Sequence, residues 1–146
     1  MRNKLILAEK PSTARILAHV VGAREKIYSG NSNAYCYFGN GYYVVNARGH
    51  LYGLGEPEDY GFSKTYNIEE LPMFPDFKIF PCGKDTEDLR TLISELMNKD
   101  DIDEIICATD AGREGELIFR HIYEANKCKK PVKRLWCNSM TDEAIR

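Results

Sequence analysis

Acidic residues gather around one short break in an apolar run of this 146-residue chain. The segment from Ile105 to Ala108 is apolar, Asp110 follows it at a Gly-containing turn, and Glu114 and Glu116 come next. This pattern predicts a buried strand, a tight turn and a helix with two acids in its first turn. Carboxylates at the carboxyl end of such a strand could bind Mg²⁺, which prefers oxygen ligands. Alternatively, the acids only complement the helix dipole on a surface.

A second strand-turn-helix pattern begins near the first residue. Lys4 to Ala8 is mostly apolar, and Glu9 and Lys10 end it before Pro11, a residue that favours the first helical position. Apolar residues at Ile16, Leu17, Val20 and Val21 predict the buried face of the helix, which Gly22 should end. Parallel strands place both turns at the same sheet edge, so Glu9 and Lys10 are expected to approach Asp110.

The segments between these two units must complete the sheet. Tyr35 to Phe38 and Tyr42 to Ala47 flank a turn rich in Gly and Asn, which predicts a β-hairpin. Its aromatic side chains could stack on nucleic-acid bases, but cross-strand packing is the more ordinary interpretation. His50 follows in an Arg-Gly-His sequence that could contact a phosphate or could simply form a loop.

The remaining segments are expected to be scaffold. Residues 51–81 carry four of the six prolines and many aromatics, which predicts an ordered excursion wrapped over the core. Thr86 should begin an amphipathic helix that ends near Asn98. Residues 132–137 read as another strand, and Thr141 opens a helix in which the sequence ends. We therefore expect residues 1–146 to be one domain of a larger protein.

Composition narrows the class of protein. The net charge is −2, but residues 1–50 carry seven Lys or Arg against two Asp or Glu, so a local phosphate-binding face is possible. Five cysteines without a C-x-x-C pair predict free thiols in a reducing compartment. No signal peptide or membrane-spanning run is recognisable. We expect a cytoplasmic, monomeric domain with no membrane partner.

Taken together, the motifs resemble the Toprim domain of type IA DNA topoisomerases, closest to the bacterial topoisomerase III group. The resemblance rests on motifs spread over essentially the whole chain, namely Ala8-Glu9-Lys10-Pro11-Ser12, Gly49-His50-Leu51, the segment from Ala108 to Ile118, and Arg134-Leu135-Trp136 with Ser139-Met140-Thr141. It implies an α/β Toprim (Rossmann-like) fold with a mostly parallel central sheet flanked by helices, an inserted β-hairpin and a Pro-rich excursion.

The resemblance also implies a chemistry divided between domains. In that family a tyrosine attacks single-stranded DNA without ATP, a second segment passes through the break, and the break is resealed. The tyrosine belongs to a later domain, so this chain alone should not relax DNA. Such an enzyme would be cytoplasmic and nucleoid-associated.

Individual residues match the family's functional positions. Glu9 matches the group that exchanges a proton with the departing 3′ oxygen, and Lys10 matches the residue that faces the scissile phosphate. Glu9, Asp110 and Glu114 match metal positions for Mg²⁺, with Glu116 as a further ligand or a supporting residue. Lys10, Arg113 and His50 are the candidate DNA-phosphate contacts.

One departure and two alternatives stand beside this interpretation. The general Toprim pattern has a second aspartate where this sequence has Gly112, which leaves the number of metal ions and their geometry open. The same acids could serve a Toprim module of a primase or nuclease. A non-catalytic α/β binding module with Asp110 as a strand-end acid is the alternative from another class.

Overall fold

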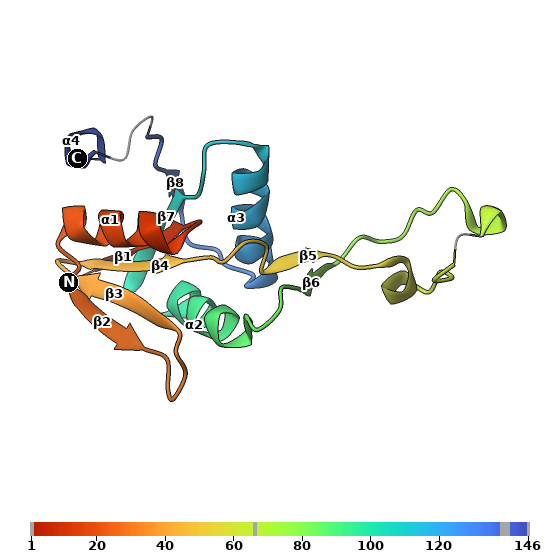
Figure 1. Ribbon diagram of the computed structural model, residues 1–146, viewed down its shortest axis with the longest axis horizontal. Coiled ribbons are helices and arrows are strands. Elements are labelled where there is room, and N and C mark those ends of the chain that lie inside the picture. Colours follow the sequence, from red (N-terminus) through yellow and green to blue (C-terminus); the bar gives the residue numbers. More distant parts are fainter. Residues whose placement is uncertain (1, 66, 138–140, 146) are drawn as a thin grey trace.

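A six-stranded sheet forms the centre of the computed structural model, which describes residues 2–65, 67–137 and 141–145 (Figure 1). The strands lie in the order β2 (Glu25–Tyr28), β3 (Tyr35–Gly39), β4 (Tyr42–Asn46), β1 (Asn3–Ala8), β7 (Ile102–Ala108) and β8 (Val132–Arg134). Strand β1 is parallel to β4 and β7, and β7 is parallel to β8, whereas β2 and β3 add antiparallel pairs. The predicted mostly parallel α/β sheet is confirmed.

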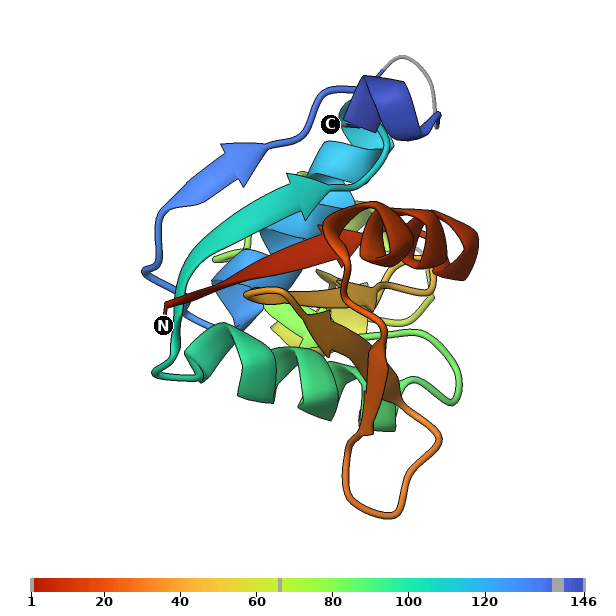
Figure 2. The same cartoon turned by 90° about the vertical axis from the view of Figure 1, so that its left-hand side faces the viewer.

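Helices cover both faces of this sheet (Figure 2). Helices α1 (Pro11–Val21) and α4 (Asp142–Ile145) lie on one face, and α2 (Glu87–Asn98) and α3 (Arg113–Ala125) lie on the other. Successive side chains of β1 point to opposite faces of the sheet. Leu5 and Leu7 pack in the core with α2 and α3, and Ile6 packs towards α1. The central strand is therefore buried on both sides, which explains its nearly continuous apolar sequence.

Helix α1 begins and ends where the sequence predicts, but its buried face agrees with the prediction only at Leu17. Its buried residues are Thr13, Ala14, Leu17 and Ala18, while Ile16, Val20 and Val21 are only partly buried. The prediction ranked residues by hydrophobicity, whereas the sheet surface selects small side chains that allow close approach. Thr13 and the two alanines therefore join Leu17 at the interface, in place of Ile16, Val20 and Val21.

The predicted hairpin is present and belongs to the main sheet. Strands β3 and β4 pair antiparallel around Asn40 and Gly41, which both have positive φ (50° and 79°), as a type I′ turn requires. Cross-strand packing of the hairpin aromatics is confirmed, because Phe38 pairs with Tyr43 and their ring centroids lie 4.4 Å apart. The exposed edge strand β2 was not predicted.

The Pro-rich excursion does not wrap over the core, so that prediction is wrong. Short strands β5 (Tyr52–Leu54) and β6 (Ile79–Pro81) pair at its base, and the intervening chain extends away from the sheet as an arm with two 3₁₀ turns, Pro57–Tyr60 and Ile68–Glu70 (Figure 1). Ile68 and Phe74 are 78% and 83% exposed. Aromatic content suggested burial, but the arm has no described partner layer to provide it.

The last strand is shorter than predicted. Strand β8 ends at Arg134 because its partner β7 ends at Ala108, and Trp136 is 67% exposed beyond it. Helix α4 begins at Asp142, close to the predicted start. Ser139 and Met140, which contribute to the family resemblance, lie outside the described residues.

Two remaining predictions concern cysteines and membranes. All five cysteines are free thiols, and Cys36, Cys107 and Cys128 are buried. Burial raises the pKa of the Cys36 thiol to about 11, so this side chain behaves as a small hydrophobic residue. Within the described ranges, no helix combines the length and the apolar character that crossing a membrane requires.

Candidate active site

The site is organised by the register between β1 and β7. Ala8 pairs with Ala108, so the turns that follow the two strands lie side by side at the carboxyl edge of the sheet. There the backbone N–H of Asp110 donates to Glu9 Oε2 at 3.0 Å. The structure thus brings together Glu9 and Asp110, as the parallel-sheet argument predicts.

Lys10 lies against these two acids. Its Nζ is 2.9 Å from Asp110 Oδ2, and both side chains are half-exposed. The pKa of Lys10 is raised by its hydrogen bond to Asp110, then by the charges of Asp110 and Glu9. Lys10 is therefore a fully charged ammonium group beside two carboxylates, exposed to anything that binds over this edge.

Glu114 and His50 form a second pair at the same edge. Glu114 lies in the first turn of α3, and its Oε1 is 3.3 Å from His50 Nε2. The contact links the segment after β4 to the start of α3. Arg113 is the first residue of α3 and is exposed. Its charge is therefore available near the helix N-terminus, where anions are favoured.

Glu116 is held differently from the other acids. Its Oε1 accepts from Arg120 Nε at 2.9 Å, and its other oxygen accepts from Arg134. Hydrogen bonds to Arg134 and then Arg120 hold the pKa of this carboxylate below its ordinary value of 4.5. Arg134 also donates to the backbone oxygen of Thr109 at 2.9 Å, so Glu116 steadies the residue that precedes Asp110.

Two glycines near Asp110 have opposite surroundings. A Cβ at Gly115 would lie 2.1 Å from the backbone oxygen of Asp110, so only glycine allows α3 to approach the turn this closely. Gly112 precedes the first residue of α3 with extended backbone (φ −156°), and a Cβ there would meet nothing within 4 Å. The turn is thus closely packed at one glycine and open at the other.

The donor set fits Mg²⁺ in a limited way. The two neighbouring turns supply the carboxylates of Glu9 and Asp110, of which Asp110 is paired with Lys10, and Glu114 lies in the first turn of α3. Across residues 2–65, 67–137 and 141–145, no group of three His, Cys, Asp or Glu side chains is arranged to hold a metal. Mg²⁺ commonly uses one or two protein carboxylates and completes its shell with water and phosphate oxygens. Two adjacent acids at an exposed edge suit that mode of binding.

Sequence reasoning missed the residues that hold the turn in place. Arg134 was noted only within a motif, and Gly115 and the buried Thr109 received no role. One signal in the sequence could have indicated the role of Arg134. It is a cation in the strand that follows the acid-rich turn, and in the structure it pairs with Cys107 of β7, close to that turn. Identifying its partner required the tertiary structure.

A parallel sheet with acids after two adjacent strands is the architecture of a Toprim domain, and the sequence comparison agrees. The family model for the Toprim domain matches residues 4–140, and the chain belongs to this family. Among curated proteins, it is 46% identical over 147 residues to DNA topoisomerase 3 of Shouchella clausii (strain KSM-K16). It is 43% identical over 148 residues to DNA topoisomerase 3 of Bacillus cereus (strain ATCC 14579) and 42% identical to that of Bacillus anthracis.

These relatives are much longer than the chain. Each alignment covers 100% of this chain but 19% of the relative. The chain is therefore homologous to one region of proteins named DNA topoisomerase 3.

Proposed function

We propose that this chain is the N-terminal Toprim domain of a topoisomerase III-like type IA enzyme that cleaves and rejoins single-stranded DNA. The observation that carries the proposal is a pair of contacts between the turns after β1 and β7. Asp110 donates its backbone N–H to Glu9, and its carboxylate pairs with Lys10. Similarity along the whole chain to proteins named DNA topoisomerase 3 supports it. The attacking tyrosine and the other DNA-binding surfaces would belong to other domains of the same cytoplasmic polypeptide.

Glu9 would transfer the proton during cleavage, and Lys10 would stabilise the negative charge that develops. When the tyrosine oxygen gives up its proton to water and bonds to phosphorus, the bond from phosphorus to the 3′ oxygen breaks, and Glu9 gives that 3′ oxygen a proton. On resealing, Glu9 takes the proton back as the 3′ hydroxyl attacks. Lys10 would stabilise the negative charge that builds on the phosphate oxygens, since its ammonium group is exposed at this edge.

The remaining acids would hold a cation and the DNA end. Glu9, Asp110 and Glu114 would bind Mg²⁺, which when bound supplies positive charge that keeps the cleaved phosphate in place. His50 and Arg113 would contact phosphates on either side of this centre. Glu116 would act indirectly, because its two arginine partners favour a supporting role over direct metal binding.

The decisive variant is Glu9→Gln in the full-length protein. We expect cleavage of a single-stranded oligonucleotide to fall about 100-fold or more, because the proton donor is lost, while binding in a gel-shift assay is retained. Glu25→Gln is the matched control, since it removes an acid from the exposed strand β2. Undiminished cleavage by Glu9→Gln would refute the assignment, and relaxation of supercoiled plasmid by the 146-residue chain alone would refute the division between domains.

A further inference from the structure

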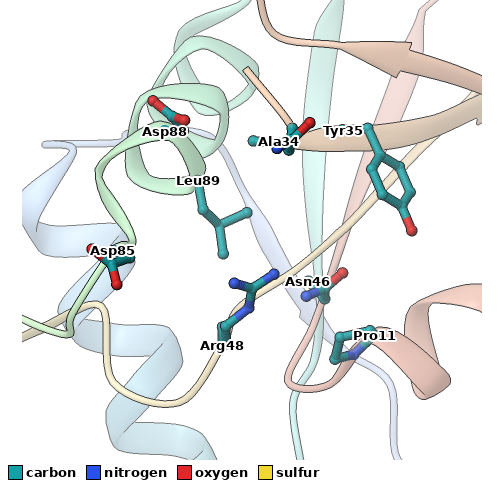
Figure 3. Close-up of a pocket in the computed structure, with 9 residues that line it drawn as sticks. Pro11, Ala34, Tyr35, Asn46, Arg48, Asp85, Asp88 and Leu89 are labelled. Carbon is teal, nitrogen blue, oxygen red and sulfur yellow. The ribbon is translucent and has the colours of Figure 1, made fainter.

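A cavity of about 270 Å³ lies next to the turn that carries Lys10, and Figure 3 shows the side chains that line it. Pro11, which directly follows Lys10, forms one wall, and Asn46 lies at the end of β4, the strand next to β1. Arg48 lines the cavity two residues before His50, the residue that contacts Glu114. The cavity and the active site therefore share the carboxyl edge of the sheet.

Side chains from two further segments, residues 33–35 and 85–89, complete the cavity. In Figure 3 the guanidinium of Arg48 lies between Leu89 on one side and Asn46 on the other, with Asp85 and Asp88 beyond Leu89 and the ring of Tyr35 beyond Asn46. The volume is just below the range of about 300–1,000 Å³ that is typical of drug-sized ligands. One planar group with a small polar substituent suits this space.

The charged side chains that line the cavity are available to a ligand. In the described part of the chain, Arg48, Asp85 and Asp88 form no ion pair within 4.0 Å. Asn46 donates its Nδ2 to the backbone oxygen of Ala47 at 2.7 Å, which leaves its Oδ1 as an acceptor. A ligand that satisfies all of these groups must carry both an anion and hydrogen-bond donors.

A nucleotide has this combination. Its phosphate would pair with Arg48, the exocyclic amine of its base would donate to Asp88 or to Asn46 Oδ1, and the base would lie against Leu89 and Tyr35. Thymine has no exocyclic amine, so it would satisfy these acceptors least well. The two carboxylates would also repel a bare phosphate deep in the cavity, which favours the base as the inserted group.

We propose that this cavity is a base-specificity subsite, which receives one unstacked base of the single-stranded DNA near the scissile phosphate. The inference rests on the proposed function, because it assumes that DNA crosses Lys10. It adds a determinant of sequence preference that lies outside the acidic centre and takes no part in the bond exchange.

The test uses the full-length protein, Mg²⁺ and a set of single-stranded oligonucleotides that differ at one position at a time, with cleavage sites mapped on a sequencing gel. Asp88→Asn should change the preference at one position about tenfold and leave the other positions unchanged. Arg48→Ala should instead weaken binding to all sequences and reduce the salt dependence of binding by about one phosphate contact. Glu87→Gln and Arg24→Ala are the matched controls, since both remove an exposed charge outside the cavity.

The outcomes separate this inference from the proposed function. If the wild-type protein cleaves DNA and both cavity variants keep its cleavage map and affinity, the subsite is overturned and the proposed function stands. If the wild-type protein cleaves none of the oligonucleotides, the proposed function fails and the subsite fails with it. A changed preference at one position in Asp88→Asn, with the Glu87→Gln map unchanged, supports the subsite.

Discussion

Gly112 stands where the wider Toprim pattern described above is expected to have an aspartate. The position is open, because a Cβ would meet nothing within 4 Å and the backbone is extended. The absence of a side chain is thus not imposed by packing. A carboxylate could stand at this position without moving its neighbours.

We therefore predict that Gly112→Asp binds Mg²⁺ more tightly than the wild-type chain, since it adds an oxygen ligand beside Asp110. Folding stability should rise by a few tenths of a kcal/mol, because aspartate is a better N-cap than glycine. Isothermal titration calorimetry checks the affinity. Gly112→Asn is the control with the same cap and no charge, and equal Mg²⁺ affinity in the two variants would contradict the prediction.

Glu116 gives the site a defined pH dependence. Its folded-state pKa is below the ordinary value of 4.5, so its pairing with Arg134 and Arg120 contributes stability above the unfolded pKa and loses it as the pH falls through the folded pKa. Because the side chain is 42% exposed, water screens the interaction and the contribution at neutral pH is up to about 1 kcal/mol.

Glu116→Gln should accordingly be less stable than the wild-type chain at pH 7, and the difference should shrink as the pH falls below 4.5. Urea unfolding of both proteins between pH 7 and acid measures this. Glu25→Gln removes an exposed acid from β2, away from the two arginines, and is the matched control. A stability difference that stays constant with pH would show that the ion pairs contribute nothing.

At the scale of elements, the site depends on how closely α3 approaches the end of β7. Gly115 is the contact point, with the backbone oxygen of Asp110 in the place where a Cβ would lie. Arg134 on β8 fixes the same turn from its other side. The position of Asp110 is therefore determined by a helix and two strands together.

Gly115→Ala should displace this turn. The added methyl group must push α3 from β7, at a cost of about 1–3 kcal/mol, and Mg²⁺ affinity should fall as Asp110 moves. Thermal unfolding with and without Mg²⁺ checks both effects. Gly112→Ser is the matched control, because the same helix gains a side chain in open space; equal losses in the two variants would contradict the role of the close approach.

Element types were predictable where local signals were strong. The apolar strands β1 and β7, the ends of α1 and α3, and the Asn-Gly turn of the hairpin follow from periodicity and turn chemistry. The approach of Glu9 to Asp110 followed from the rule that parallel strands open on one edge. The contact of Glu116 with Arg134 did not follow, because side-chain pairing across strands leaves no pattern in one sequence.

Burial was predicted less well than secondary structure. Ala14 and Ala18 are buried beside Leu17 on α1, whereas Ile16 and Val20 are only partly buried, since shape and distance decide this interface. The arm was expected to be buried because of its aromatics, yet its apolar residues are exposed. The composition of a segment shows how many apolar side chains it could bury. Whether they are buried depends on the elements that pack against the segment.

At the scale of the molecule, similar apolar side chains are buried in the compact core and exposed on the extended arm. Phe119 is 1% exposed beneath the sheet, whereas Phe74 on the arm is 83% exposed. The same residue type therefore has opposite energetic roles in the two parts. Stability should come almost entirely from the core.

Phe74→Ala should change the free energy of unfolding by no more than about 0.5 kcal/mol, because the side chain loses little contact. Phe119→Ala should cost about 3–5 kcal/mol through the cavity it leaves. Chemical denaturation of the two variants measures this contrast. A loss above 2 kcal/mol in Phe74→Ala would show that the arm packs on the core in solution.

The pairing of β1 with β7 also determines when the site can form. Glu9 and Asp110 are 101 positions apart, and their strands meet in the middle of the sheet. Contacts between distant segments carry a loop-closure cost and usually form slowly. During synthesis, β4 leaves the ribosome well before β7, so β1 can pair with β4 before β7 is available as its second neighbour. We therefore expect the acidic centre to form late in folding, so that partly folded chains that already contain the hairpin would lack it.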